Sequence, residues 1–215
     1  EDIIREAKLL AAGGYREIVL TGVNIGQYRQ GEFDLVGLIA QLERIEGLER
    51  IRISSIEPTT ITNALLDWMA SSSKLCPYLH VPLQSGDDSI LSSMNRPYNL
   101  EEFVQLIHRA MATIPHLGLG TDLMVGFPGE TKEAFEHTLG IAHELPFSYF
   151  HIFTYSQRPG TAATKLPDQV PITVARERAK ILAELSRLKR LAFAERYIGS
   201  TLSVLFESGE MDGYR

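Results

Sequence analysis

The sequence has almost no cysteine and no long apolar run, and each absence limits what the chain can be. Cys76 is the single cysteine among 215 residues, so the chain alone can form neither an internal disulfide nor a metal site built from several thiolates. No stretch approaches the roughly 18–20 apolar residues of a membrane span, and there is no signal-like start. We therefore expect a cytoplasmic protein with no membrane partner.

The chain also lacks the common nucleotide-binding loops and an excess of positive charge. Neither GxGxxG nor GxxxxGK[ST] follows the first predicted strand, which disfavours nucleotide sites of the common kinds. The net charge of −6 argues against a nucleic-acid footprint over the whole surface, although a local basic face stays possible. An apolar fraction of 44% is ordinary for a globular protein that buries a core.

The stretch TDLMVGFPGE, residues 121–130, predicts a buried strand that turns directly into a helix. Leu123, Met124 and Val125 are apolar, and the glycines and proline that follow end regular structure. Thr131 is placed to cap the next helix, and Glu133 favours the positive end of its dipole. Such a loop either binds a ligand, since its N–H groups suit an anion, or merely connects two elements.

The same strand-then-helix unit recurs along the chain about every 30–40 residues, which predicts right-handed crossovers and a parallel sheet. Periodicity places the strands at residues 17–21, 50–54, 78–83, 118–125 and 147–155. Pro82 weakens the third of these because proline cannot donate to a strand ladder. The expected fold class is α/β, a partial TIM-like (β/α) barrel with parallel strands.

The last third of the chain predicts a linker, a long helix and one more strand. Residues 163–171 are bracketed by prolines, and a helix is expected from about Thr173 to Tyr197. Lys and Arg outnumber Glu on this helix, and we interpret them as a solvated charged face. Gly199 ends the helix, and a strand is expected from Leu202 to Phe206.

Polar and glycine residues gather just past the predicted strands, where a barrel places its site. They are Gly22, Asn24, Ser55, Glu57, Gln84, Ser85, Gly126, Tyr155 and Ser156. Amides, hydroxyls, one carboxylate and glycines suit a ligand that carries a ribose, an amine and a carboxylate, and they poorly suit a hydrolytic triad. Arg96 could clamp a carboxylate with its planar fork, or it could form a surface ion pair.

Histidines and cysteine give no metal-binding pattern in the sequence. His80 and His151 fall inside predicted strands, where we expect hydrogen-bonded core histidines. No cluster of His, Cys and carboxylate residues shows metal-ligand spacing, so we expect no metal ligands in this chain. Cys76 precedes a strand and is expected to be a small buried apolar residue.

Several motifs together resemble the radical S-adenosylmethionine methylthiotransferases. They are TGVNIGQY, RIRISSIEP, LHVPLQSGDDSILSSMNRPY, TDLMVGFPGET and FTYSQRPGTAA. Their order and spacing agree along nearly the whole chain. SSIEP looks most like the branch that methylthiolates N6-threonylcarbamoyladenosine beside the tRNA anticodon, whereas the branches acting on isopentenyladenosine or on a ribosomal protein share most of the other motifs.

The resemblance implies a domain organisation and a set of cofactors. Residues 1–198 would be the radical S-adenosylmethionine barrel without its first strand and its CxxxCxxC loop, and residues 199–215 would begin a carboxy-terminal TRAM-like β domain. The full-length enzyme would use S-adenosylmethionine and two [4Fe–4S] clusters whose ligands are not in this chain. It would be a monomer that needs tRNA (the anticodon stem-loop) and an electron donor, and this fragment alone would be inactive.

Residue roles follow from the resemblance, motif by motif. We expect no catalytic residues in this chain. The cofactor-binding residues would be Gly22, Asn24, Ser55, Glu57, Gln84, Ser85, Arg96 and Gly126, and Tyr155 and Arg158 would lie on the substrate side. In the family, a 5′-deoxyadenosyl radical abstracts hydrogen from C2 of the adenine, sulfur is inserted from the second cluster, and another S-adenosylmethionine donates the methyl group.

Two other classes of function stay open on the sequence. A barrel lyase or isomerase acting on a phosphorylated metabolite would want a Lys or an acidic pair at the strand ends, and neither is convincing. A non-catalytic RNA-binding barrel module would use the basic helix and the last strand, and its tRNA binding would depend strongly on salt.

Overall fold

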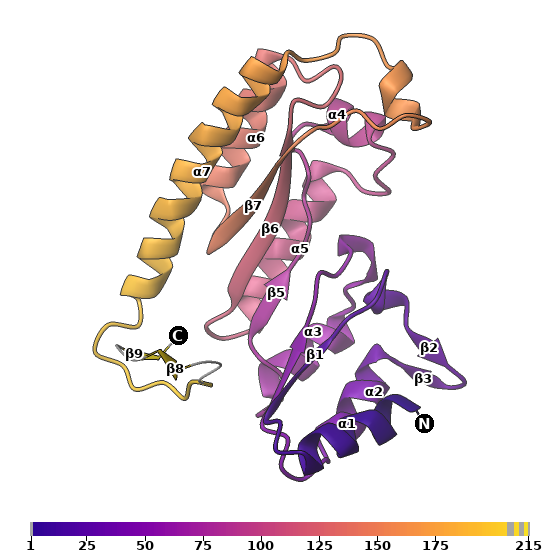
Figure 1. Ribbon diagram of the computed structural model, residues 1–215, viewed down its shortest axis with the longest axis vertical. Coiled ribbons are helices and arrows are strands. Elements are labelled where there is room, and N and C mark those ends of the chain that lie inside the picture. The colour runs from indigo at the N-terminus through magenta and orange to yellow at the C-terminus, as the bar shows by residue number, and fades with distance from the viewer. Residues whose placement is uncertain (1, 206–208, 211–212, 215) are drawn as a thin grey trace.

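The computed structural model describes residues 2–205, 209–210 and 213–214, and its sheet is flanked by helices (Figure 1). The helices are α1 (Asp2–Ala12), α2 (Leu35–Leu42), α3 (Asn63–Ser71), α4 (Asp88–Ser93), α5 (Leu100–Thr113), α6 (Lys132–Glu144) and α7 (Ile172–Glu195). The strands are β1 (Glu17–Leu20), β2 (Arg29–Gln30), β3 (Phe33–Asp34), β4 (Arg50–Ile53), β5 (Tyr78–His80), β6 (Gly118–Val125), β7 (Tyr149–Thr154), β8 (Gly209–Glu210) and β9 (Gly213–Tyr214).

Five parallel strands form the curved sheet in the order β1-β4-β5-β6-β7. β1 pairs with β4 from Glu17↔Arg50 onward, and β5, β6 and β7 pair in sequence. The isolated bridges Ile51↔Leu75 and Ser55↔His80 join the two groups of strands. Each strand but the last returns through a helix to its neighbour, which confirms the predicted α/β partial barrel.

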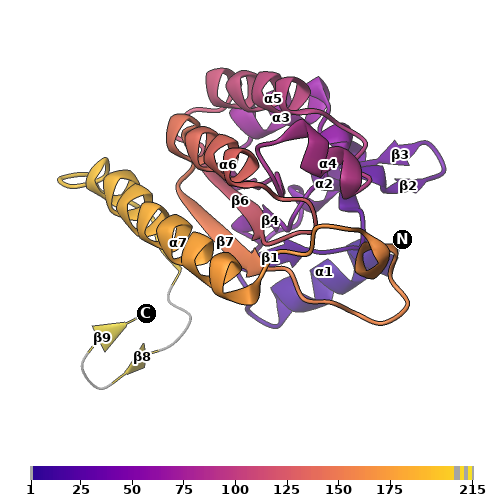
Figure 2. The same cartoon turned by 90° about the horizontal axis from the view of Figure 1, so that it is seen from above.

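The two faces of the sheet differ in burial. On the outer face, Leu119, Leu123 and Val125 of β6 are fully buried beneath the helices, with α3, α5 and α6 covering this side (Figure 2). On the inner face, alternate residues of the edge strands stay exposed, among them Val19 of β1 and Phe153 of β7. Because successive side chains of a strand point to opposite faces, one set builds the core and the other lies on the inner face.

Helix starts are capped where the sequence predicts. The Asp34 side chain accepts a hydrogen bond from Gly37 N at 2.9 Å, and Thr131 does the same for Ala134 N at 3.1 Å. Asn99 and Glu102 form the predicted capping box at the start of α5. Each cap satisfies a backbone donor that the first helical turn leaves unpaired, which fixes where the helix begins.

The third predicted strand is wrong in length, because β5 ends at His80 instead of Leu83. Pro82 has no N–H, so the ladder breaks there, and the Thr121 hydroxyl takes over. It donates to Val81 O at 2.7 Å and accepts from Leu83 N at 3.0 Å. Pairing with β6 resumes at the bridge Gln84↔Leu123, beyond the proline.

Two further expectations about strands fail. The short antiparallel hairpin β2–β3 lies between the first loop and α2, where no strand is predicted. The strand expected from Leu202 does not form, since residues 202–205 are irregular, and Phe206 lies outside the described residues. β8 and β9 pair antiparallel beyond it, and the proposed domain division at residue 198 stays a prediction.

The long helix α7 is not simply a solvated charged face. Arg178 is buried, and Lys189 donates from Nζ to the carbonyls of His143 at 2.8 Å and Leu145 at 2.6 Å. Burial also lowers the pKa of Lys189. Cys76 is only half-buried rather than a core residue. Within the described part of the chain, no helix combines the length and apolarity that crossing a membrane requires.

Candidate functional site

The predicted site residues other than Arg96 follow the ends of five parallel strands, so the topology brings them to one edge of the sheet. Glycines let the loops of this edge approach other elements closely. A Cβ on Gly26, after β1, would lie 2.0 Å from Thr60 Oγ1 in the loop after β4. A Cβ on Gly86, after β5, would lie 2.7 Å from the backbone of Thr138 in α6. The loops are therefore packed in place rather than loosely tethered.

Asn24 lies in the loop after β1, beside Gly22, and precedes the short 3₁₀ turn Ile25–Gln27. Its Oδ1 atom is buried and has no hydrogen-bond partner among the described residues. A buried amide oxygen without a partner is costly, because it has lost water and gained nothing. Such an atom at a strand end fits a ligand that brings its own donor.

Glu57 and Arg96 meet across the edge, the first from the loop after β4 and the second after α4. Arg96 Nη1 lies 3.4 Å from Glu57 Oε1, and both side chains are partly exposed. The structure thus shows the ion-pair alternative for Arg96, with a carboxylate that the protein itself supplies. Ser55, two residues before Glu57, is exposed and bridges to His80.

Gln84 and Ser85 are buried in the segment that follows β5, and the backbone of Gln84 is strained. Gln84 has a φ of 71°, a left-handed conformation that costs a non-glycine residue energy and recurs at functional sites. Two backbone hydrogen bonds to β6 hold Gln84 in place. Its N–H donates to Asp122 O, and its carbonyl accepts from Met124 N, each at 2.8 Å. Ser85 Oγ lies 3.3 Å from Thr138 Oγ1 of α6.

Tyr98 fixes the same loop from the side. Its hydroxyl donates to the carbonyls of Pro82 at 3.0 Å and Leu83 at 3.2 Å. Burial raises the pKa of Tyr98 to about 12, which strengthens the preference for the protonated phenol that donates these bonds. The sequence motif MNRPY singles out Arg96, but the neighbouring Tyr98 is the residue that anchors the segment after β5.

Gly126 ends β6 with a φ of 78°, and Glu130 and Arg178 hold the turn behind it. Glu130 Oε2 accepts from Gly126 N at 2.6 Å and from Arg178 Nη1 at 2.5 Å, and Arg178 also donates to Glu130 O at 2.9 Å. Burial raises the pKa of Glu130, while the Gly126 N–H and the Arg178 guanidinium oppose that rise. Sequence reasoning missed both residues, since Arg178 lies 48 residues further along the chain.

A cavity of about 400 Å³ lies between the ends of β6 and β7 and the start of α7. Gly126, Tyr155, Gln169 and Ala175 are among the residues that line it. Tyr155 packs edge-on against Phe127 with ring centroids 5.3 Å apart, and its buried hydroxyl has no partner among the described residues. Arg158, three residues on, is exposed and outside this lining.

The carboxyl edge fits S-adenosylmethionine, but the chain does not fit an iron–sulfur cluster. Asn24 Oδ1 and the Tyr155 hydroxyl are buried and unpartnered within the described residues, as expected where a polar ligand supplies the missing hydrogen bonds. Cys76 is the single thiol of the sequence and precedes β5, at the opposite end of that strand from Gln84. Thiolates for a cluster must come from outside this sequence.

A larger cavity of about 1100 Å³ lies elsewhere, between α1 and the β2–β3 hairpin. Ile3, Leu9, Tyr28 and Phe33 are among its lining residues, and none of the predicted site residues belongs to it. Its size therefore does not move the candidate site away from the carboxyl edge.

Comparisons with known proteins agree with this geometry. The family model for the radical SAM superfamily matches residues 1–142. A tRNA-2-methylthio-N(6)-dimethylallyladenosine synthase from Ehrlichia chaffeensis is 41% identical over 97% of this chain and 48% of its own length. A threonylcarbamoyladenosine tRNA methylthiotransferase from Aquifex aeolicus is 40% identical over 95% of this chain and 50% of its own length. The chain spans about half the length of these curated relatives.

Solved structures share the fold at low sequence identity. Coproporphyrinogen III oxidase from Escherichia coli, a radical SAM enzyme, aligns with a TM-score of 0.59 at 18% identity, over 92% of this chain and 45% of that one. A radical S-adenosylmethionine methyltransferase from Kitasatospora setae aligns with a TM-score of 0.52 at 16% identity, over 70% of this chain and 29% of that one. From the match over most of its length and from its parallel partial barrel, this chain belongs to the radical SAM superfamily.

Proposed function

We propose that this chain is the cofactor-positioning barrel of an enzyme that methylthiolates an adenosine of tRNA. The observation that carries the proposal is identity of about 40% along nearly the whole chain to relatives named as tRNA methylthiotransferases. The partial barrel and its unpartnered polar atoms at the carboxyl edge support it independently.

The residues of the carboxyl edge would bind and orient S-adenosylmethionine. Asn24 Oδ1 and the Tyr155 hydroxyl are buried without a partner among the described residues, and we assign Tyr155, which the resemblance puts on the substrate side, to the cofactor as well. Gly126 lines the cavity beside Tyr155. Gly22, Ser55, Gln84 and Ser85 line neighbouring strand ends, and the Glu57–Arg96 pair offers a carboxylate and a guanidinium for the amino-acid end. When bound, S-adenosylmethionine supplies the radical and the methyl group, and the protein orients it and excludes water.

Cofactor binding by this chain is tested by titration calorimetry with S-adenosylmethionine. Tyr155→Phe removes the unpartnered hydroxyl and should weaken binding by about 2-fold to 10-fold, the worth of one hydrogen bond. Tyr15→Phe is the matched control, because Tyr15 is exposed and distant from the carboxyl edge. Equal affinities of the two variants would contradict the role of Tyr155, and no binding by the unmodified chain would remove the proposed cofactor site.

The finer proposal is that the substrate is N6-threonylcarbamoyladenosine beside the anticodon, reached from the side of Tyr155 and Arg158. The SSIEP segment, residues 54–58, favours this branch, while the relatives of both tRNA branches are about equally similar. We expect tRNA from cells that lack the full-length gene to lose 2-methylthio-N6-threonylcarbamoyladenosine in nucleoside mass spectrometry. Loss of the isopentenyladenosine derivative instead would assign the alternative tRNA branch. Unchanged tRNA would overturn a tRNA substrate and leave the ribosomal-protein branch and the non-catalytic module as alternatives.

A further inference from the structure

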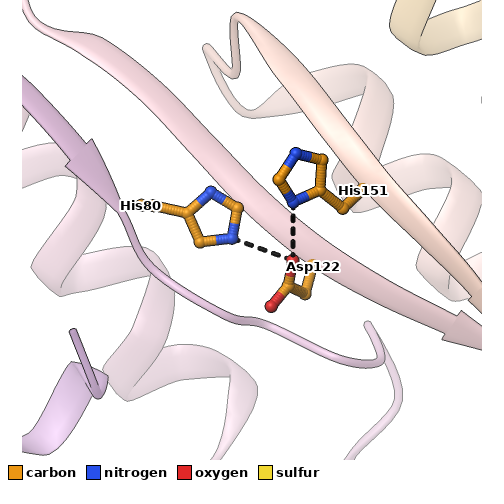
Figure 3. Close-up of side chains that lie close together, drawn as sticks. All are labelled: His80, Asp122 and His151. Atoms are coloured by element: carbon orange, nitrogen blue, oxygen red, sulfur yellow. Dashed lines mark hydrogen bonds and ion pairs between the residues drawn. The ribbon is translucent and has the colours of Figure 1, made fainter. Parts of the chain in front are cut away.

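Two histidines and an aspartate from three neighbouring strands converge on the inner face of the sheet, where His80 is the last residue of β5 (Figure 3). His80 Nε2 of β5 lies 2.8 Å from Asp122 Oδ1 of β6, and His151 Nδ1 of β7 lies 3.3 Å from the same oxygen. The three ligand atoms lie within 4.8 Å of one another. Sequence spacing could not show this cluster, because its members are far apart in the chain.

The cluster has a supporting shell. His80 Nδ1 lies 3.0 Å from the Tyr149 hydroxyl, which also contacts the Tyr78 hydroxyl. Gly120 makes this possible, since a Cβ there would lie 2.4 Å from Tyr149 Cζ. Histidines that ligate metals commonly donate their other ring N–H to such a partner, which fixes the tautomer and the ring orientation.

The exposure of the three side chains also suits a metal ion. The His80 side chain is 4% exposed and Asp122 is 18%, whereas His151 is 57% exposed, which corrects the expectation that both histidines lie in the core. The cluster is thus rigid on one side and open on the other. Two guanidinium groups lie nearby. Arg52 stacks over Tyr78 at 5.3 Å and pairs with Glu17 at 3.6 Å, and Arg190 stacks over Tyr149 at 5.8 Å.

We propose that His80, Asp122 and His151 bind a divalent transition-metal ion of the zinc class, with water completing the coordination. Two imidazoles and one carboxylate are a ligand set that Zn²⁺ accepts, with bonds of about 2.0–2.2 Å. Two ligands of a tetrahedral ion on such bonds lie about 3.4 Å apart. The two histidine nitrogens lie 2.8 Å and 3.3 Å from Asp122 Oδ1, close to that separation. The ion would tie β5, β6 and β7 together, about 13 Å along β6 from Gly126 at 3.3 Å per residue.

The proposal is tested by titrating the metal-free chain with Zn²⁺ alone in a calorimeter and with Co²⁺ as a spectroscopic probe. We expect one saturable site per chain and visible Co²⁺ absorption of low-coordinate type. His151→Asn removes one ligand at an exposed position where the fold tolerates change, and should weaken binding by more than about 100-fold. Tyr149→Phe leaves all three ligands and should weaken binding by about 10-fold to 100-fold, as changes of outer partners do.

His137→Asn is the matched control. His137 Nδ1 also lies 2.8 Å from a carboxylate, Asp87 Oδ2, and no third ligand joins them among the described residues. This variant should keep the affinity of the unmodified chain, and circular dichroism establishes that every variant is folded. Absence of a saturable site, or equal loss in His137→Asn and His151→Asn, would overturn the proposal and leave the cluster as a hydrogen-bonded group only.

Discussion

At the residue scale, the buried pair Glu130–Arg178 connects the turn after β6 to α7. The side chains of Glu130 and Arg178 are 1% and 10% exposed, and the Arg178 guanidinium also stacks over Phe135 at 5.2 Å. Buried ion pairs add little net stability, but removing one partner leaves an uncompensated charge. Glu130 thus depends on Arg178 to keep its carboxylate, and with it the Gly126 N–H, in place.

Arg178→Met should destabilise the chain by about 3–5 kcal/mol at neutral pH, because it strands the Glu130 carboxylate. Burial raises the pKa of Glu130, and losing the opposing guanidinium raises it further. In the variant the folded state therefore holds a proton that the unfolded state releases above the ordinary Glu pKa. Stability of the variant falls as pH rises through this window, so the loss relative to the unmodified chain is smaller at about pH 5 than at about pH 7.

Urea unfolding at the two pH values measures this difference. Glu130→Gln with Arg178→Met removes both charges and should recover part of the loss at neutral pH. A loss that is the same at both pH values would contradict an ionised Glu130 as its cause.

Gly126→Ala tests how closely the backbone after β6 approaches α7. The substitution places a Cβ 2.5 Å from Ala175 Cβ in addition to the cost of a φ of 78°. Gly129→Ala is a matched control with a φ of 86° and no atom within 4 Å of its Cβ. The control should lose about 1–2 kcal/mol of unfolding free energy, and Gly126→Ala about 1–3 kcal/mol more. If chemical denaturation gives the two variants equal losses of unfolding free energy, α7 shifts to make room for the added Cβ.

At the element scale, the end of β5 depends on one hydroxyl of β6. Thr121→Val keeps the shape but leaves Leu83 N and Val81 O without their bonds to Oγ1. Unfolding free energy should fall by about 1–3 kcal/mol for these unsatisfied buried groups, whereas Thr121→Ser should keep most of it. Thermal unfolding of both variants measures the difference, and a serine variant as unstable as the valine one would point to lost packing instead.

The elements that sequence predicts well are those whose signals are local. Asp34, Asn99 and Thr131 mark helix starts by side chains that bond within three residues, so their caps are readable in advance. The segment after β5 shows the limit of such local signals. Pro82 predicts a break in the strand ladder, but nothing near it in the sequence predicts the Thr121 hydroxyl that bridges the break. The strand expected at Leu202 rests only on a short apolar run in the sequence, and residues 202–205 belong to no sheet.

At the scale of the whole molecule, parallel topology makes part of the site predictable and hides the rest. Residues past successive strands must share an edge, which places Asn24, Gln84, Gly126 and Tyr155 together on sequence alone. The partners of those residues are set by packing between distant elements. For that reason the sequence leaves Arg96 with two alternatives, a ligand carboxylate or an ion pair, and does not identify Glu57 as its partner. For the same reason the sequence does not predict the cluster of His80, Asp122 and His151.

The outer edge of β1 is the feature of the whole molecule with the plainest consequence for behaviour in solution. Among the described residues, β1 pairs with β4 alone, so one of its edges presents unpaired N–H and C=O groups. Val19 on this strand is 50% exposed. An open, partly apolar strand edge is a template for pairing with another chain.

We therefore expect the isolated chain to self-associate in light scattering as its concentration rises. Val19→Glu puts a carboxylate on the edge strand, beside its pairing partner Arg52, and should shift the chain toward monomer. Val23→Glu makes the same chemical change in the exposed loop after β1, outside the strand, and should associate like the unmodified chain. A clean monomer at every concentration would show that the β1 edge is protected. Equal effects of the two variants would assign the association to net charge rather than to strand pairing, because only Val19 lies on the edge.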